Sequence, residues 1–375
     1  MTFDRAKSVA MLEALERRTS AEPPRQVRRY VSYLERTSEM ATLDPAAMIL
    51  PRPDAPGLVP YRPDLPLDWT DGLSMRRAQP VSVPARLACL NYQRDAPFVH
   101  DTSNGYALGR TPTEARLHAL LEVIERDAFL MTWYTRQSPI PLNLELGAPR
   151  PVQHLADACA RQGYDLRAYR TTQDSGVPSV WVTAQARRTG VPHLHALAGA
   201  HLDPWQAVMA GALEVSTSIF LNARLHDLAA GARCLRHDHE VRTPRDHFNL
   251  YAHPASAPRL KFLDTLDPQP VAEAFADDFQ AKGLTPTQAL DALTATLLAR
   301  HDDVIFVDLT TPALYRYGWF CVRALVPGLL PLSFGHRTRR TQGCARLERA
   351  WVALGQTERA RTPAGDRWCS PHPFG

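Results

Sequence analysis

The sequence predicts a mixed α/β fold, with strands and helices alternating along the chain. Short apolar and β-branched runs, typical of strands, are interleaved with longer stretches whose apolar residues recur at helical spacing. One acidic helical pattern recurs further along the chain in altered form, which indicates internal pseudo-repeats. The 375 residues are 45% hydrophobic and 22% charged, enough for one large domain or two modest ones.

Composition excludes several classes of protein. The net charge of +4, from 43 basic and 39 acidic residues, is too small to predict nucleic-acid binding. Six cysteines are scattered without a CxxC pair, which disfavours both a zinc site and a disulfide framework. The N-terminus lacks the apolar core of a signal peptide, and no apolar run is long enough to span a membrane. We therefore expect a cytoplasmic protein without a membrane partner.

The first helix is expected over residues 4–19, with Glu13 and Glu16 flanking its apolar stripe. Residues 25–41 predict a second helical stretch. A proline-rich stretch follows, and its prolines exclude a regular helix or a central strand there. Because its aromatic residues and leucines must pack somewhere, we expect residues 20–80 to form an ordered excursion within one domain.

The most informative segment begins with a Ser-Asn-Gly turn at residues 103–105, since asparagine and glycine tolerate a left-handed backbone. A threonine and a proline at positions 111–112 then predict a helix start. At 3.6 residues per turn, His118, Glu122 and Glu125 share one flank of this helix, beside its buried stripe.

The remaining elements alternate in type. A third and degraded copy of the acidic helix keeps Glu214. Strands are expected within residues 79–92, 165–172, 177–186, 301–314 and 319–335, and a helix over residues 205–228.

The recurring acidic helix suggests a metal site. Glutamates three residues apart project from one side of a helix, so two such helices facing each other would gather four carboxylates. That cluster requires a cation, and Mg²⁺ prefers carboxylate oxygens and often bridges to phosphates. The predicted ligands are Glu13, Glu16, Glu122 and Glu125.

An arginine follows each glutamate pair, Arg17 in the first helix and Arg126 in the second. These side chains could neutralise phosphate oxygens or hold the glutamates in place. The alternative is a solvated helix flank with weak ion pairs, and the residues alone leave both interpretations open. The sequence contains no GxxxxGK[ST] loop and no GxGxxG turn between a strand and a helix.

These segments together resemble the YcaO superfamily of ATP-dependent peptide-backbone enzymes, over nearly the whole chain. Six segments match in order: residues 6–18 (AKSVAMLEALERR), 60–72 with 80–92, 103–129 (SNGYALGRTPTEARLHALLEVIERDAF), 199–218, 307–335 and 371–375 (PHPFG). The resemblance implies a single YcaO-like domain over residues 1–375, whose acidic helices form the nucleotide site.

The resemblance also implies cofactors and roles. ATP and Mg²⁺ are expected, with the four glutamates on the metal. Ser103, Asn104, His118, Arg17, Arg126, Arg323 and Glu214 are expected at the nucleotide, and Pro371, His372 and Pro373 near the reacting amide. In the azoline-forming branch, a Cys, Ser or Thr side chain of a ribosomal precursor peptide attacks the preceding carbonyl. Phosphorylation by ATP then lets the oxygen leave, and a thiazoline or oxazoline remains.

The sequence departs from the family pattern in places. The family usually has a lysine-bearing strand before the first acidic helix, and the lysine has no counterpart here. Thr217 stands where the third helix usually has glutamine, and the chain ends in glycine where a further proline is frequent.

No leader-recognition domain is evident, so we expect a ThiF-like or leader-peptide-binding partner protein, and a homodimer stays open. The resemblance implies that this chain is an ATP- and Mg²⁺-dependent cyclodehydratase of the azoline-forming branch. Two alternatives remain, a thioamide-forming enzyme of the same family and a catalytically impaired scaffold that binds the peptide for a partner enzyme.

Overall fold

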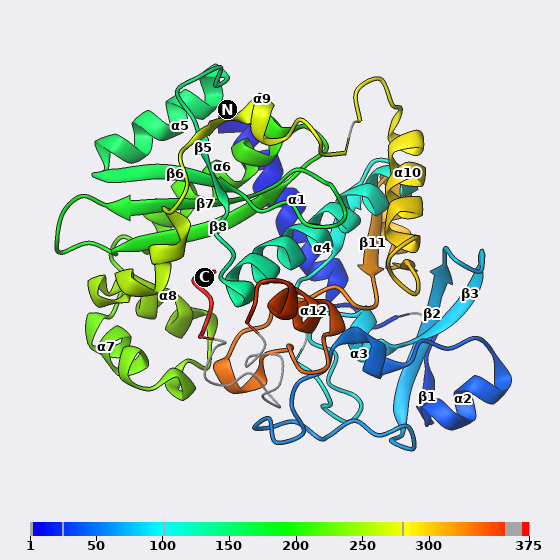
Figure 1. Ribbon diagram of the computed structural model, residues 1–375. Helices are drawn as coiled ribbons and strands as arrows, with labels where there is room; N and C mark the ends of the chain where they lie inside the picture. The colour runs from blue at the N-terminus through cyan, green and yellow to red at the C-terminus, as the bar shows by residue number, and fades with distance from the viewer. Residues whose placement is uncertain (1–2, 25, 101, 280, 357–369, 375) are drawn as a thin grey trace. The chain divides into compact units, whose positions relative to one another are not determined.

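The computed structural model describes residues 3–24, 26–100, 102–279, 281–356 and 370–374. It shows a mixed α/β fold with two sheets, which confirms the predicted class (Figure 1). The chain divides into two compact units. Unit 1 comprises Met1–Val123, Lys282–Ser333 and Arg340–Ala345, and unit 2 comprises Ile124–Ala281, Phe334–Arg339 and Arg346–Gly375. Both units are assembled from several chain segments, so the chain crosses between them more than once. The expectation of a single domain stays a prediction.

Unit 1 is built on a six-stranded antiparallel sheet in the order β1-β2-β10-β11-β4, with β3 on the other side of β2. Helix α1 packs on β4 and β11. The strands are β1 (Arg28–Val31), β2 (Leu67–Ser74), β3 (Gln79–Pro84), β4 (Tyr106–Gly109), β10 (Ile305–Asp308) and β11 (Phe320–Leu325). The helices are α1 (Phe3–Ser20), α2 (Tyr33–Glu39), α3 (Ala85–Ala88), α10 (Pro286–Leu298) and α11 (Pro312–Arg316), with a 3-10 helix at Pro45–Met48.

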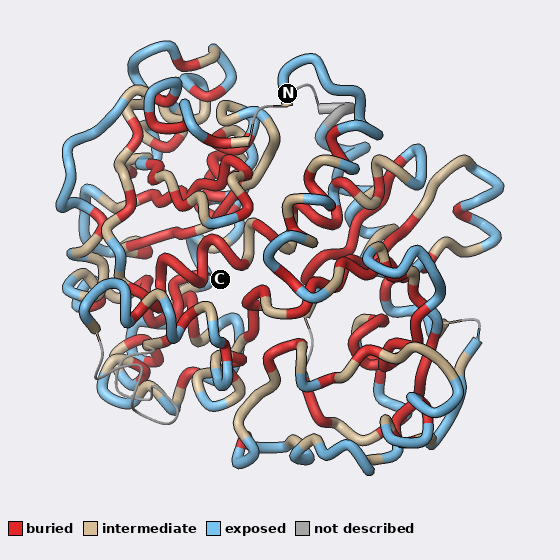
Figure 2. Tube along the Cα trace, turned by 45° about the vertical axis from the view of Figure 1, so that its right-hand side comes forward, coloured by how far each residue is buried: buried red, intermediate tan, exposed pale blue. Residues whose placement is uncertain are grey.

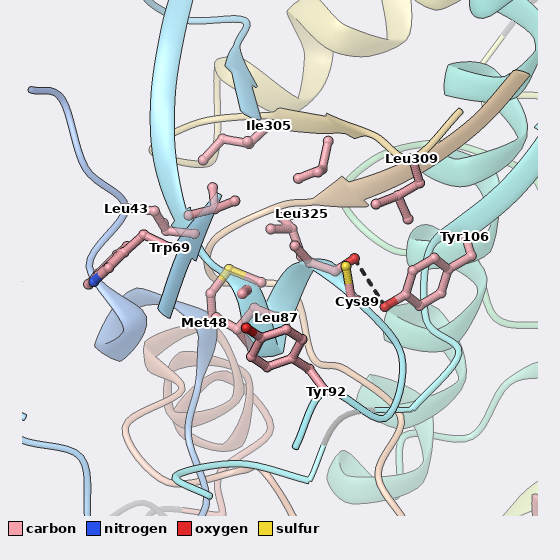
Figure 3. Packing of buried hydrophobic residues seen from close by; sticks show 14 of the residues in the cluster. Leu43, Met48, Trp69, Leu87, Cys89, Tyr92, Tyr106, Ile305, Leu309 and Leu325 are labelled. Carbon is pink, nitrogen blue, oxygen red and sulfur yellow. Dashed lines mark hydrogen bonds between the residues drawn. The ribbon is translucent and has the colours of Figure 1, made fainter. Parts of the chain in front are cut away.

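A buried cluster fills unit 1 between the sheet and the loops that follow it. The expectation that the proline-rich stretch holds no central strand is wrong at its end, where β2 begins directly after the last proline, Pro66, and pairs with β1, β10 and β3. Trp69 on β2 is fully buried. Trp69, Leu87, Tyr106 and Leu325 belong to the same cluster (Figure 3). Burial of this apolar surface, at roughly 25 cal/mol per Å² removed from water, is what orders segments that have little regular structure of their own.

The second predicted helical stretch is wrong in its first half. Residues 28–31 form β1, which pairs with β2 through Arg28–Trp69 and Val31–Leu67. Helix α2 starts only after Ser32, whose side chain forms a capping box with Glu35. The pairing partner of β1 lies about 40 residues later, so no local pattern could announce it. The strand predicted at residues 79–92 likewise ends at Pro84, where α3 begins.

Unit 2 is built on a five-stranded sheet in the order β8-β7-β6-β5-β9. Its strands are β5 (Ile140–Asn143), β6 (Tyr164–Arg170), β7 (Ser179–Ala186), β8 (Leu194–Ala200) and β9 (Gln269–Pro270). Its helices are α5 (Arg150–Arg161), α6 (Pro204–Asn222), α7 (Leu228–Arg236), α8 (Pro244–Ala252) and α9 (Val271–Ala274), with 3-10 helices at Asp238–Glu240, Pro254–Leu263 and His336–Thr338. The two remaining helices, α4 (Pro112–Thr135) and α12 (Ala345–Ala353), have residues in both units.

Strand β7 shows how the unit 2 sheet is covered. Val180 and Val182 pack with α5 and α6 on one face, whereas Trp181 packs with the rings of Phe129 and Trp133 on the other. This two-residue alternation explains why β7 is almost wholly buried and why its sequence reads as a near-continuous apolar run. Figure 2 draws the buried stretches of the chain in red.

The cysteines among the described residues are buried and pack in the interior. Cys89, Cys159, Cys234 and Cys321 are buried and not disulfide-bonded, Cys344 is buried, and Cys369 lies outside the described residues. Burial raises the pKa of Cys89 to about 12 and that of Cys321 to about 12. Among the described helices, none is long and apolar enough to cross a membrane.

Candidate functional site

The first glutamate pair lies on α1, and its two members have different surroundings. Glu16 is half-buried, and its Oε2 accepts a hydrogen bond of 3.2 Å from the backbone N–H of Leu108 on β4. Burial raises the pKa of Glu16 to about 7, against the opposing effect of this hydrogen bond, and neighbouring Glu13 raises it further. Glu13 itself is exposed and forms a 2.6 Å ion pair with Arg17. The α1 pair therefore presents one desolvated and one solvated carboxylate.

The second glutamate pair lies on α4, where Glu122 and Glu125 are about one helical turn apart. Glu122 is half-buried, and the Glu125 side chain is only 12% exposed. Glu125 Oε1 is buried and accepts no hydrogen bond from the described residues, while Arg126 Nη1 lies 3.5 Å from it. Burial raises the pKa of Glu125, although Arg126 and a backbone hydrogen bond from Ala200 favour the charged form. A carboxylate oxygen left in this state suits a cation, since Mg²⁺ supplies the charge that solvent no longer balances.

The four glutamates do not form a ready-made cluster. Among the described residues, no group of three or more His, Cys, Asp or Glu side chains is arranged to hold a metal ion. The joint Mg²⁺ site of Glu13, Glu16, Glu122 and Glu125 therefore stays a prediction.

The Ser103-Asn104 turn has a structural role in unit 1. Asn104 is buried, its Nδ2 donates to the carbonyl of Leu332 at 2.8 Å, and its Oδ1 accepts from the N–H of Leu332 at 3.2 Å. Gly105 follows with φ +72°, and a Cβ there would lie 2.5 Å from Val123. Ser103 is exposed. The side-chain amide of Asn104 is thus used within the fold, and contact of either residue with a nucleotide stays a prediction.

Arg323 lies beside this turn. It is buried, its Nη1 donates to the carbonyl of Thr102 at 3.3 Å, and its guanidinium carbon lies 4.1 Å from the ring centre of Tyr106. Both contacts orient a fixed positive charge inside unit 1, which suits a phosphate ligand. His118 and Glu214 are exposed on α4 and α6, so their predicted contacts with the nucleotide remain untested.

The C-terminal segment is buried in unit 2. Pro371, His372 and Pro373 are all buried, and the His372 ring stacks on that of His247 with centroids 4.2 Å apart. Their predicted position near a reacting amide stays a prediction.

Sequence reasoning missed Asp127, which directly follows the Glu-Arg pair on α4. Asp127 is 2% exposed and receives two hydrogen bonds from Arg346 on α12, at 2.7 and 3.1 Å. Arg346 also donates to Asp174, at 2.6 and 3.1 Å. The only signal available was an acid placed beside the buried stripe of the helix, because its partner lies 219 residues away.

Acidification is expected to destabilise the protein through two buried histidines of unit 2. Burial, the main cause, lowers the pKa of His195 and of His247 from 6.5 to about 4. The unfolded chain then binds protons that the folded chain does not. The free energy of unfolding should therefore be highest above pH 6.5, where both histidines are neutral in the folded and the unfolded chain. It should fall as the pH drops towards 4, by up to about 3 kcal/mol per histidine.

Urea unfolding at pH 7 and pH 5 measures this effect. His195→Gln should make the pH dependence shallower, and replacement of exposed His239 by glutamine should not. Equal unfolding free energies at both pH values would contradict the expectation.

Comparisons with known proteins identify the fold and the family of this chain. An uncharacterized protein of Methanothermobacter thermautotrophicus is 25% identical over 335 residues, covering 88% of this chain and 79% of its own length. Among solved structures, a heterocyclase in complex with substrate and cofactor matches with a TM-score of 0.77 at 20% identity, over 97% of this chain and 48% of its own. This chain thus spans about half the length of that heterocyclase.

A second solved structure is YcaO from Methanopyrus kandleri bound with AMPPCP and Mg²⁺. It matches with a TM-score of 0.64 at 23% identity, over 88% of this chain and 77% of its own. At these identities the two structures establish a shared fold. The sequence model of the family described as YcaO cyclodehydratase, ATP- and Mg²⁺-binding, matches residues 1–330. That description confirms the expected cofactors, ATP and Mg²⁺, at the level of the family, and the chain belongs to the YcaO cyclodehydratase family.

Proposed function

We propose that this chain binds magnesium–ATP and activates a backbone amide of a ribosomal precursor peptide, cyclising Cys, Ser or Thr to thiazoline or oxazoline. The observation that carries the proposal is Glu125 Oε1, a buried carboxylate oxygen without a hydrogen-bond donor among the described residues, in a family that binds ATP and Mg²⁺. Desolvated Glu16 in the other acidic helix supports the same interpretation. We assign Glu13, Glu16, Glu122 and Glu125 to the metal.

Positive side chains would then bind the phosphates. We assign Arg17, Arg126 and Arg323 to this role, because a guanidinium matches phosphate oxygens with two donors. Ser103, Asn104, His118 and Glu214 complete the proposed nucleotide-binding set.

The proposed reaction asks the protein mainly to position groups and neutralise charge. Bound magnesium–ATP supplies the γ-phosphoryl group that makes the carbonyl-derived oxygen a leaving group. The peptide's own thiol or hydroxyl adds to the preceding carbonyl carbon and loses its proton, and the oxygen departs as phosphate. The new C–S or C–O bond closes the five-membered ring, and loss of the amide proton as phosphate leaves forms the C=N bond of the azoline. We propose that Pro371, His372 and Pro373 lie near this amide.

We propose that a ThiF-like or leader-peptide-binding partner protein presents the precursor. One solved structure of similar fold is the E. coli microcin synthetase McbBCD complex, with a TM-score of 0.60 at 14% identity, and this supports a division of labour between proteins. Tight binding of precursor peptide by this chain alone, measured by native mass spectrometry, would contradict the need for a partner.

Reconstitution with precursor peptide and partner, followed by mass spectrometry, tests the proposal. ATP-dependent loss of one water per ring supports the cyclodehydratase, and exchange of oxygen for sulfur instead indicates a thioamide-forming enzyme. If magnesium–ATP produces no thermal shift while peptide still binds, the chain is a peptide-binding scaffold.

A further inference from the structure

Three consecutive carbonyls of the C-terminal segment are each bound by a buried side chain of unit 2 (Figure 1, red segment). Trp133 Nε1 donates to the carbonyl of Ser370 at 2.9 Å, Tyr251 Oη to that of Pro371 at 2.5 Å, and His247 Nδ1 to that of His372 at 2.7 Å. We call Trp133, Tyr251 and His247 the carbonyl clamp. Trp133 comes from α4, and the other two lie one turn apart on α8.

The clamp's histidine is fixed as a donor. The backbone N–H of Gly335 donates to His247 Nε2 at 3.1 Å, so Nε2 must be the accepting nitrogen and Nδ1 carries the proton. Burial keeps this imidazole neutral by lowering its pKa to about 4. Each carbonyl of residues 370–372 therefore accepts a hydrogen bond from a side chain that keeps its proton near neutral pH. Two prolines, Pro371 and Pro373, further restrict the backbone between these contacts.

The clamped backbone places Phe374 against the acidic helix. The ring of Phe374 is 5% exposed and packs edge-on against Phe129, with centroids 5.2 Å apart. The guanidinium carbon of Arg126 lies 4.3 Å from the centre of the same ring. Arg126 is the residue that follows Glu125 in the sequence and stands 3.5 Å from its Oε1. The C-terminal segment thus touches the arginine of the Glu-x-x-Glu-Arg motif with an aromatic face.

We propose that Phe374, positioned by the carbonyl clamp, fixes the orientation of the Arg126 guanidinium for phosphate binding. The inference rests on the proposed function, because it takes Arg126 to be a phosphate ligand. An arginine side chain has several rotatable bonds, and contact of one guanidinium face with an aromatic ring restricts the directions in which its N–H groups point. Phe374 and the clamp are positioning residues, since they act through Arg126.

Phe374→Leu tests the inference in the full chain, because leucine preserves an apolar side chain and removes the ring. We expect the Kd for magnesium–ATP, measured by isothermal titration, to rise about fivefold to tenfold, which corresponds to about 1 to 1.4 kcal/mol. Phe374→Tyr keeps the ring and should bind within about twofold of the unaltered chain. The matched control is Phe275→Leu, another buried phenylalanine of unit 2, which has the guanidinium of Arg170 5.7 Å from its ring centre.

The outcomes separate the inference from the function. If the unaltered chain binds no magnesium–ATP, the proposed function fails and the inference fails with it. If it binds and Phe374→Leu binds equally well, or Phe275→Leu weakens binding to the same extent, the inference alone is overturned. A purely structural role would lower the melting temperature without changing the Kd below that temperature. Should Phe374→Leu fold poorly, Tyr251→Phe removes one clamp donor and keeps the ring, and an unchanged Kd there overturns the inference.

Discussion

Replacement of Glu16 by glutamine is expected to lower magnesium–ATP-dependent turnover by about 10²- to 10³-fold while leaving the fold intact. Glutamine keeps the shape and can still accept the hydrogen bond from Leu108, but it loses the negative charge that a metal ligand needs. Because burial disfavours the charged form of Glu16, the neutral variant should unfold at the same temperature as the unaltered chain or slightly above it.

Turnover with saturating peptide and a thermal melt, run on the same preparation, measure the two effects. The control is Glu22→Gln, an exposed glutamate just beyond α1 that lies 3.9 Å from Arg18. A Glu16→Gln variant that keeps more than a tenth of the turnover, or that unfolds markedly earlier, would show that Glu16 is structural and does not bind the metal.

Replacement of Asp127 by alanine should lower the free energy of unfolding by about 3 to 5 kcal/mol, the usual cost of leaving one partner of a buried ion pair unpaired. Asp127 and Arg346 have side chains that are only 3% and 10% exposed. Without Asp127, Arg346 keeps its ion pair with Asp174, whose side chain is 41% exposed. The anchorage of α12 on this part of α4 is therefore expected to weaken.

Chemical denaturation with a two-state fit measures the change, and Asp165→Ala is the matched control. Asp165 also pairs with an arginine, Arg187, but the two side chains are 43% and 53% exposed, so we expect a loss below about 1 kcal/mol. Losses of similar size at both sites would contradict the assignment of Asp127 as a buried anchor.

Local sequence patterns were sufficient to predict the helices and strands whose formation depends mainly on neighbouring residues. The acidic helix on α4 and the strands β6 and β7 form where apolar periodicity placed them. Strand β1 was missed because its four residues are stabilised by pairing with Trp69 and Leu67, far along the chain.

The same physical reason limits prediction of the candidate site. Spacing alone identified two glutamate pairs, but it could not show that Glu13 is solvated while Glu16 is buried against Leu108. Nor could it show that the amide of Asn104 bonds Leu332, 228 residues away. The contacts that decide whether a polar side chain serves the fold or a ligand are long-range, and no window of sequence contains them.

The buried cysteines allow the local opening of each unit to be measured separately by alkylation. A thiolate is the reactive form of cysteine, so alkylating reagents should modify Cys89 and Cys321 only when unit 1 opens, and Cys159 and Cys234 only when unit 2 opens. With Cys369 replaced by serine, the order in which peptides carrying these residues gain mass in a timed alkylation series would rank the two units by local opening free energy. Added nucleotide should then slow alkylation of the cysteines most in the unit that binds it.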